Sequence, residues 1–120
     1  RGKRVLEIGT GLGVSTVAMA ETAASVASVD VDPWCHSARE FPENVTLLSE
    51  MPIEGEFDIT FIDGNHRYDS VMRDIRQAAS RVLVIHDSYL KDVRRAIKDS
   101  KLLVVEVYPT RCRLALCEKP

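Results

Sequence analysis

The stretch that decides the fold is VLEIGTGLGVST, residues 5–16. It begins with Val5-Leu6-Glu7-Ile8, a short apolar run with β-branched residues, and this run ends at Gly9. Beyond the glycines, small and apolar residues recur near helical spacing: Val14, Val17, Ala18 and Ala24. The stretch therefore predicts a strand, a glycine turn and a helix, which together form half of a βαβ unit.

The rest of the chain alternates between predicted strands and predicted helices. Further strands are expected at residues 26–31, 45–48, 57–62, 82–85, 103–107 and 112–117. Further helices are expected at residues 34–40, from Tyr68 to Ala79 and around residues 90–97. Such alternation predicts an α/β fold, a mostly parallel sheet with helices on both faces. The last two strands are close enough in sequence to form an antiparallel hairpin.

Length and composition narrow the class of protein. With 120 residues we expect one domain, spanning residues 1–120, minimal and without an evident lid or substrate domain. The formal charge of -2 carries no electrostatic footprint for nucleic acid or an anionic membrane. No apolar run reaches the roughly 18 residues that a membrane span needs, and three cysteines without metal spacing favour reduced thiols. We therefore expect a cytoplasmic protein that acts on a small molecule.

The glycine turn predicts a cofactor. Glycines let a ligand approach the backbone without a Cβ in the way, and the following helix N-terminus offers free N–H groups. The spacing is G-x-G-x-G, not the G-x-G-x-x-G of dinucleotide folds, so an NAD-dependent oxidoreductase is disfavoured. Glu7, just before the glycines, suits a cofactor that carries an amino group. Asp30, at the end of the next strand, can accept both hydroxyls of a ribose, and its alternative role is to form a turn.

Four segments carry a resemblance to a known family. Residues 5–13 and Ser28-Val29-Asp30-Val31-Asp32-Pro33 resemble the first two motifs of class I S-adenosylmethionine (SAM)-dependent methyltransferases. FDITFIDGNHRY, residues 57–68, followed by VLVIHDS, residues 82–88, is similar to a subgroup with the pattern F-I-D-G-x-H-x-Y … H-D, which includes small-molecule O-methyltransferases. The resemblance implies a Rossmann-like seven-stranded sheet with the strand order 3-2-1-4-5-7-6.

The resemblance also implies a set of cofactor-binding residues. Glu7 and the glycine loop would lie near the methionine part of SAM, Asp30 on its ribose, and Ser49, Glu50 and Met51 beside the adenine. The full expected set is Glu7, Gly9, Thr10, Gly11, Gly13, Ser15, Asp30, Val31, Ser49, Glu50, Met51 and Asp63.

Asp63 and His66 are the expected catalytic residues. Asp63 and Asp87 both follow strands, so they should face the crevice where ligands bind in open α/β sheets. In the metal-dependent O-methyltransferases that the chain resembles, acids at these two positions bind Mg²⁺, although Ser88 here replaces a third ligand. His66 could act as a general base or could cap and pack the helix that begins near Tyr68. His86 should point away from Asp87, because neighbouring residues in a strand face opposite sides.

Two classes of function remain open at this point. The first is a SAM-dependent methyltransferase that methylates an oxygen of a small-molecule acceptor, in which Asp63 and His66 align the acceptor and manage its proton. The alternative is a SAM-binding module without catalysis, acting as a sensor or as part of a larger assembly. The small size supports the alternative. The small size is also compatible with a homo-oligomer in which a partner subunit covers the substrate.

Overall fold

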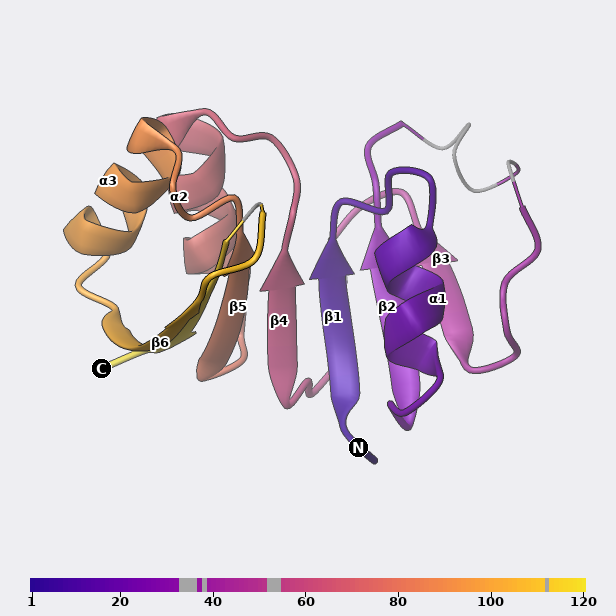
Figure 1. The fold of residues 1–120 in the computed structure, drawn as a ribbon. Helices are drawn as coiled ribbons and strands as arrows, with labels where there is room; N and C mark the ends of the chain where they lie inside the picture. Colours follow the sequence, from indigo (N-terminus) through magenta and orange to yellow (C-terminus); the bar gives the residue numbers. More distant parts are fainter. Residues whose placement is uncertain (33–36, 38, 52–54, 112) are drawn as a thin grey trace.

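The computed structural model describes residues 1–32, 37, 39–51, 55–111 and 113–120, which form seven strands and three helices (Figure 1). The strands are β1 Arg4–Ile8, β2 Ser25–Val29, β3 Val45–Leu48, β4 Ile59–Ile62, β5 Val82–His86, β6 Leu103–Tyr108 and β7 Leu114–Glu118. The helices are α1 Val14–Ala20, α2 Tyr68–Gln77 and α3 Lys91–Asp99. None of these described helices is long and apolar enough to cross a membrane. The helix expected at residues 34–40 lies largely outside the described residues.

All seven strands join one sheet in the order β3-β2-β1-β4-β5-β7-β6. The pairs among β1 to β5 are parallel, whereas β7 is antiparallel to both β5 and β6. The carboxyl ends of the five parallel strands therefore meet at one edge of the sheet, which is the upper edge in Figure 1. This topology confirms the predicted strand order and the C-terminal antiparallel hairpin.

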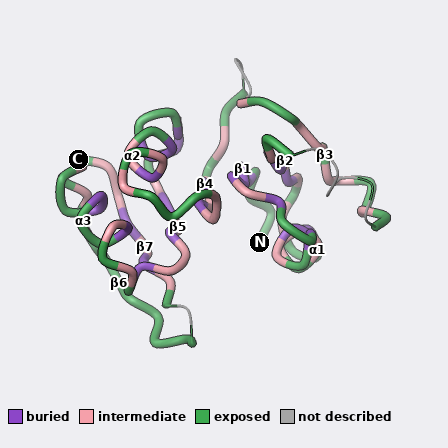
Figure 2. The backbone as a smooth tube through the Cα atoms, turned by 90° about the horizontal axis from the view of Figure 1, so that it is seen from above, coloured by how far each residue is buried: buried purple, intermediate pink, exposed green. Residues whose placement is uncertain are grey.

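Helices cover both faces of the sheet, as predicted (Figure 2). The larger core lies under α2 and α3 and includes Leu6, Ile62, Ile75, Leu83 and Val93. The smaller core lies under α1 and contains Val5, Ala20 and Val26. Alternation along β1 explains the division, because successive side chains of a strand point to opposite faces.

The buried face of α1 does not coincide with the apolar residues whose spacing predicted the helix. Val14 is 66% exposed and Ala24 lies beyond the end of the helix, whereas Thr16 and Ala20 are buried. A hydroxyl residue occupies the inner face because Thr16 donates a hydrogen bond to the buried carboxylate of Glu7. Hydrophobic spacing therefore predicted the helix correctly but did not show which side it turns to the sheet.

Three strands are shorter at one end than the sequence predicted, among them β7, which begins at Leu114 instead of residue 112. β2 ends at Val29, because the Asp30 carboxylate turns the chain by accepting a hydrogen bond of 3.0 Å from the backbone N–H of Asp32. Val31 is thereby left 87% exposed outside the strand. β4 begins at Ile59, two residues after the expected start at Phe57.

At the far edge of the sheet, every residue of β6 is exposed. Most of its side chains are nonetheless apolar: Leu103, Val104, Val105, Val107 and Tyr108. Its ladder with β7 is irregular between Val104 and Glu106. Because β6 lies at the edge beside β7 and all its residues are exposed, it contributes little to the core.

Candidate functional site

A cavity of about 540 Å³ opens at the carboxyl ends of β1, β2, β3 and β4, beside α2. This volume lies within the range of small-molecule binding sites. Six of the residues expected to bind cofactor line it: Gly9, Asp30, Val31, Glu50, Met51 and Asp63. The structure thus brings the ends of four strands together around one ligand-sized space, as the rule for open α/β sheets predicts.

The three glycines of the loop serve different purposes. A Cβ on Gly9 would lie 2.1 Å from the backbone oxygen of Asp63, so Gly9 allows the ends of β1 and β4 to approach each other. Gly13 is the left-handed N-cap of α1, and a Cβ there would lie 2.7 Å from the Phe41 ring. A Cβ on Gly11 would meet nothing within 4 Å. Only the surroundings of Gly11 therefore match the expectation that glycine leaves room for a ligand.

Glu7 is fully buried beneath the glycine loop and does not line the cavity. Its carboxylate accepts hydrogen bonds from the hydroxyls of Ser15 and Ser28, both at 2.6 Å, and from Thr16. Burial raises the pKa of Glu7, and the three hydroxyl donors oppose that rise. Ser15 therefore supports Glu7, and a contact of either residue with the cofactor stays a prediction.

Asp30 holds the glycine loop in place. Its Oδ2 accepts hydrogen bonds from the backbone N–H groups of Thr10 at 3.0 Å and Gly11 at 3.1 Å. Thr10 is fixed further by a 2.7 Å hydroxyl contact with Ser28. The turn-forming role that the sequence left as an alternative is therefore present, and it coexists with a position in the cavity wall. Ribose binding by Asp30 stays a prediction.

Ser49, Glu50 and Met51 follow β3, where the resemblance places the adenine. Glu50 and Met51 line the cavity, and Ser49 is exposed beside it. Met51 also packs against the larger core. Of these three residues, only Glu50 and Met51 therefore belong to the cavity wall.

Asp74 is a cavity residue that sequence reasoning missed. It lies on α2, is 4% exposed, and would be 3.3 Å from a Cβ on Gly64. Burial raises the pKa of its carboxyl, and the Arg73 guanidinium, 3.6 Å away, opposes that rise. A signal existed, because Asp74 stands between Val71 and Ile75 on the inward stripe of α2, where a charged residue is unexpected.

Four titratable side chains converge where β4 and β5 end: Asp63, His66, His86 and Asp87. The Nε2 atom of His66 lies 2.8 Å from Asp87 Oδ2 and 3.7 Å from Asp63 Oδ1. The Nδ1 atom of His86 lies 3.0 Å from Asp87 Oδ2 and 3.1 Å from Asp63 Oδ1. The structure therefore brings together the two expected metal-binding acids and the expected base, and it adds His86. We call these four residues the Asp–His cluster.

The prediction that His86 points away from Asp87 was wrong. β5 ends at His86, and Asp87 is the first residue of the following turn, with a left-handed φ of 55°. Strand alternation therefore stops before Asp87, whose side chain turns back to the His86 side. The parallel register also brings Asp63 to His86, because Ile62 pairs with Ile85 and these two residues follow directly on their strands.

Asp63 is shared by the cavity and the Asp–His cluster. Burial raises the pKa of its carboxyl, and the neighbouring His86 and His66 oppose that rise.

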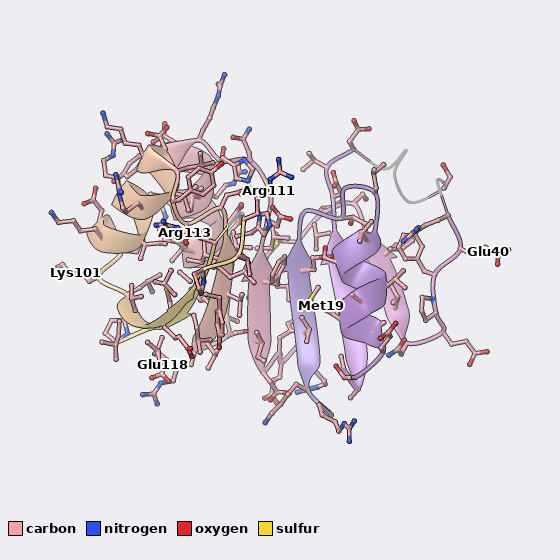
Figure 3. All side chains as sticks on the ribbon, viewed as in Figure 1. Met19, Glu40, Lys101, Arg111, Arg113 and Glu118 are labelled. Atoms are coloured by element: carbon pink, nitrogen blue, oxygen red, sulfur yellow. The ribbon has the colours of Figure 1, made fainter. Side chains whose placement is uncertain are left out.

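Ser88, the residue at the position of the third metal ligand, is buried next to this site. Its backbone N–H donates a hydrogen bond of 3.3 Å to the backbone oxygen of Arg113. Figure 3 shows Arg111, on the turn between β6 and β7, at the same end of the sheet.

Comparisons with known proteins agree with this architecture. A family model described as a methyltransferase domain matches residues 6–88. No curated protein sequence matches the chain. Among solved structures, the magnesium protoporphyrin IX methyltransferase of Synechocystis PCC 6803 with bound SAM is similar, with a TM-score of 0.75, 15% identity and coverage of 99% of this chain and 71% of that one.

Two further structures show the range of the fold. The N-methyltransferase NodS from Bradyrhizobium japonicum WM9 in complex with S-adenosyl-l-homocysteine has a TM-score of 0.71 at 16% identity, covering 98% of this chain and 78% of that one. The tRNA (m1A58) methyltransferase TrmI from Aquifex aeolicus has a TM-score of 0.71 at 16% identity, covering 98% and 62%. At such identities the likeness concerns the fold alone, so these structures do not identify an acceptor or support excluding nucleic acid.

The matched residues 6–88 include the glycine loop, the cavity wall after β2 and β3, and the whole Asp–His cluster. The chain belongs to the methyltransferase domain family and is a SAM-dependent methyltransferase.

Proposed function

We propose that the protein transfers the methyl group of SAM to an oxygen atom of a small-molecule acceptor. The observation that carries this proposal is the position of Asp63, which lines the cavity and also belongs to the Asp–His cluster. A cofactor in the cavity and a proton acceptor in the cluster would then be separated by one side chain.

Methyl transfer from a sulfonium is an in-line displacement, in which the bond from the acceptor oxygen to the methyl carbon forms as the carbon–sulfur bond breaks. A hydroxyl acceptor must also lose its proton. His66 suits this task, because its side chain is 42% exposed and its Nε2 atom lies 2.8 Å from Asp87. The carboxylates of Asp87 and Asp63 would stabilise the imidazolium that forms. This geometry favours the general-base role of His66 over helix capping.

The proposed cofactor contacts follow the cavity wall. Asp30 would bind the ribose hydroxyls, and Val31, Glu50 and Met51 would surround the adenine beside Ser49. The methionine end would meet the loop that contains Thr10, Gly11 and Gly13, above the buried Glu7 and its partner Ser15. These assignments rest on the resemblance and are supported by the six expected residues that line one cavity.

Magnesium does not suit the residues around Asp63 and Asp87. The two carboxylates approach the same point, but the imidazole nitrogens of His66 and His86 point there as well. Mg²⁺ prefers a shell of oxygen ligands and water and retains its hydration strongly. Mg²⁺ therefore has no part in the proposed reaction.

Methyl transfer itself separates the enzyme from a SAM-binding module. The protein is incubated with methyl-labelled SAM and a panel of hydroxylated metabolites, with amine metabolites and tRNA as competing acceptor classes. We expect label on an oxygen of a small molecule. Calorimetric titration with SAM, with NAD as the control ligand, checks the cofactor site independently. Binding of SAM without label transfer to any acceptor would favour the module, and label on nitrogen or on tRNA would contradict the proposed acceptor.

Variants test the assigned roles. His66→Gln should lower kcat by about 10² to 10⁴ while SAM affinity stays unchanged, because only the proton acceptor is removed. Asp63→Ala should lower both kcat and SAM affinity, because Asp63 belongs to the cavity and to the cluster. Asp69→Asn, an exposed carboxylate in the first turn of α2, is the matched control and should leave both unchanged. Full activity in Asp63→Ala would exclude the assigned role.

A further inference from the structure

The cavity has a wall on helix α2 to which neither the glycine loop nor the family resemblance assigns a role. Four polar side chains of α2 line the cavity: Ser70, Arg73, Asp74 and Gln77. Residues three and four positions apart lie on one face of a helix, so these four form a single stripe. A helix face toward the interior is ordinarily apolar. The polar stripe therefore indicates a ligand with polar groups of its own.

Asp74 is the residue of this stripe that lacks a hydrogen-bond donor. Its side chain is buried, and among the described residues its carboxylate has one polar contact. That contact is with the adjacent Arg73, whose Nε atom lies 3.6 Å from Oδ1, which is longer than a hydrogen bond. Glu7, the other carboxylate among the buried described residues, accepts hydrogen bonds from three hydroxyls. Because a buried carboxylate without donors is costly, Asp74 can accept a donor from a ligand.

The Asp74 carboxylate lies beside the ends of two strands, β1 and β4. A Cβ on Gly64, just after β4, would lie 3.3 Å from Asp74 Oδ2 and 3.7 Å from Cγ2 of Ile8, the last residue of β1. Gly64 has no side chain that could cover this carboxylate. All three residues line the cavity. A ligand in the cavity can therefore reach the carboxylate of Asp74.

The cavity matches the nucleoside half of SAM. Its lining includes the residues expected on the ribose and beside the adenine, which are Asp30, Glu50 and Met51. Gly11 and Gly13, expected at the methionine end, do not line it. A purine base has apolar faces and a polar edge. The cavity offers both kinds of surface, with apolar side chains at Ile8 and Val29 and the polar stripe on α2.

We propose that Asp74 accepts a hydrogen bond from the exocyclic amino group of the SAM adenine and thereby makes the cofactor site selective for adenine. This amino group is the one N–H donor of the base in a nucleoside, and an ionised carboxylate is purely an acceptor. Glu50 also lines the cavity, but it is exposed, so water can replace a lost partner. Asp74 has the larger effect on selectivity, because a base without the amino group would leave a buried carboxylate unpaired.

Asp74 would act on the cofactor that the proposed function places in the cavity, independently of the methyl acceptor. Cofactor binding is measured without any acceptor. Label transfer to nitrogen or to tRNA would therefore contradict the proposed acceptor and leave the role of Asp74 intact. Absence of cofactor binding would overturn the role of Asp74 together with the proposed cofactor contacts.

The test compares two ligands that differ in one group. S-adenosylhomocysteine carries the amino group, whereas S-inosylhomocysteine carries in its place an oxygen, which cannot donate. In calorimetric titrations of the full chain, S-adenosylhomocysteine should bind about 10 to 100 times more tightly. The side-chain amide of Asp74→Asn can donate to the inosine oxygen, so the ratio of the two affinities should fall at least about tenfold. Equal affinities in the natural protein, or an unchanged ratio in Asp74→Asn, would overturn the proposal.

Two further carboxylates serve as comparisons. Asp69→Asn is the matched control, because Asp69 is exposed in the first turn of α2, and it should keep both affinities. Glu50→Gln tests the competing acceptor, and loss of selectivity there but not in Asp74→Asn would overturn the proposal.

Circular dichroism verifies the folding of each variant. Carbon-13 NMR of the aspartate carboxyl groups in the natural protein provides a second readout that needs no folded Asp74→Asn. We expect S-adenosylhomocysteine to shift the resonance of the Asp74 carboxyl carbon more than S-inosylhomocysteine does. Identical shifts with the two ligands would contradict a hydrogen bond from the amino group.

Discussion

The turn after β1 and the turn after β5 both require left-handed backbone, but they obtain it differently. The β1 turn uses glycine at positions 9, 11 and 13, each with positive φ. The β5 turn uses Asp87, a residue with a side chain, at a φ of 55°. Glycine adopts this conformation without strain and brings no functional group, whereas aspartate tolerates it and also brings a carboxylate.

This difference explains why the sequence predicted the turn after β1 but not the position of the Asp87 side chain after β5. Closely spaced glycines such as Gly9, Gly11 and Gly13 indicate a turn in any sequence. Asp87 has no comparable signal in the sequence, and only its left-handed backbone conformation places its carboxylate 3.0 Å from the His86 nitrogen. Sparsely populated backbone conformations often occur at functional sites, where the side chain has a task.

The largest effect should follow a change at Gly9. A Cβ there would lie 2.1 Å from the Asp63 oxygen, at a φ of 100°, so the ends of β1 and β4 must separate. We expect Gly9→Ala to lower the free energy of unfolding by at least about 3 kcal/mol, or to prevent folding. Urea denaturation measures this effect.

Gly11→Ala is the control for Gly9→Ala, because it adds the same methyl group at a φ of 55° with nothing within 4 Å. Its expected loss is about 1 kcal/mol, from backbone conformation alone. Equal losses in the two variants would contradict the role of Gly9 in bringing β1 and β4 together.

A smaller effect should separate the two roles of Asp87. Asp87→Gly and Asp87→Ala both remove the carboxylate, but only glycine fits the left-handed turn without strain. We expect Asp87→Gly to be more stable than Asp87→Ala by about 1 kcal/mol in urea denaturation. Both variants should lose the contact with His66 and lower methyl transfer to the same extent. Equal stability would show that the turn is not strained, and unequal activity would show that the backbone, not the carboxylate, serves the site.

The smallest effect concerns the buried carboxyl below the glycine turn. Burial raises the pKa of Glu7 above its ordinary value of 4.5, so the folded protein holds this proton more tightly than the unfolded chain does. Glu7 therefore contributes most to stability below that ordinary value, and the contribution is lost as pH rises through the raised pKa. Glu7→Gln should flatten this part of the stability–pH curve and raise stability at neutral pH, measured by thermal denaturation across pH.

The same variant should weaken SAM binding if Glu7 serves the methionine end of the cofactor. Ser15→Ala, which removes one hydroxyl donor from Glu7 at 2.6 Å, should raise the pKa of Glu7 further and steepen the curve. A stability curve of Glu7→Gln that has the same pH slope as the natural protein would contradict the assignment of that slope to Glu7.

Much of the fold followed from local patterns. The glycine turn, the alternation of strands and helices and the C-terminal hairpin predicted a mostly parallel sheet with an antiparallel end, and the family resemblance supplied its strand order. The inner face of α1 did not follow, because Thr16 is buried to satisfy Glu7 and hydrophobicity alone does not register that partnership. Asp74 was missed although it stands on the inward stripe of α2, because the stripe does not reveal that a cavity lies beside it.

For this protein, the sequence by itself determined the alternation of strands and helices, the glycine turn and the C-terminal hairpin, because glycine turns, strand ends and helix stripes are local features. The resemblance to a known family supplied the strand order and the expected cofactor, and the roles of Asp63 and His66 stay predictions. The tertiary structure alone decided that His86 and Asp87 share one side and that Asp63 joins the cavity to the Asp–His cluster. Those facts depend on the backbone turn at Asp87 and on the register between β4 and β5, and neither can be read from residue order.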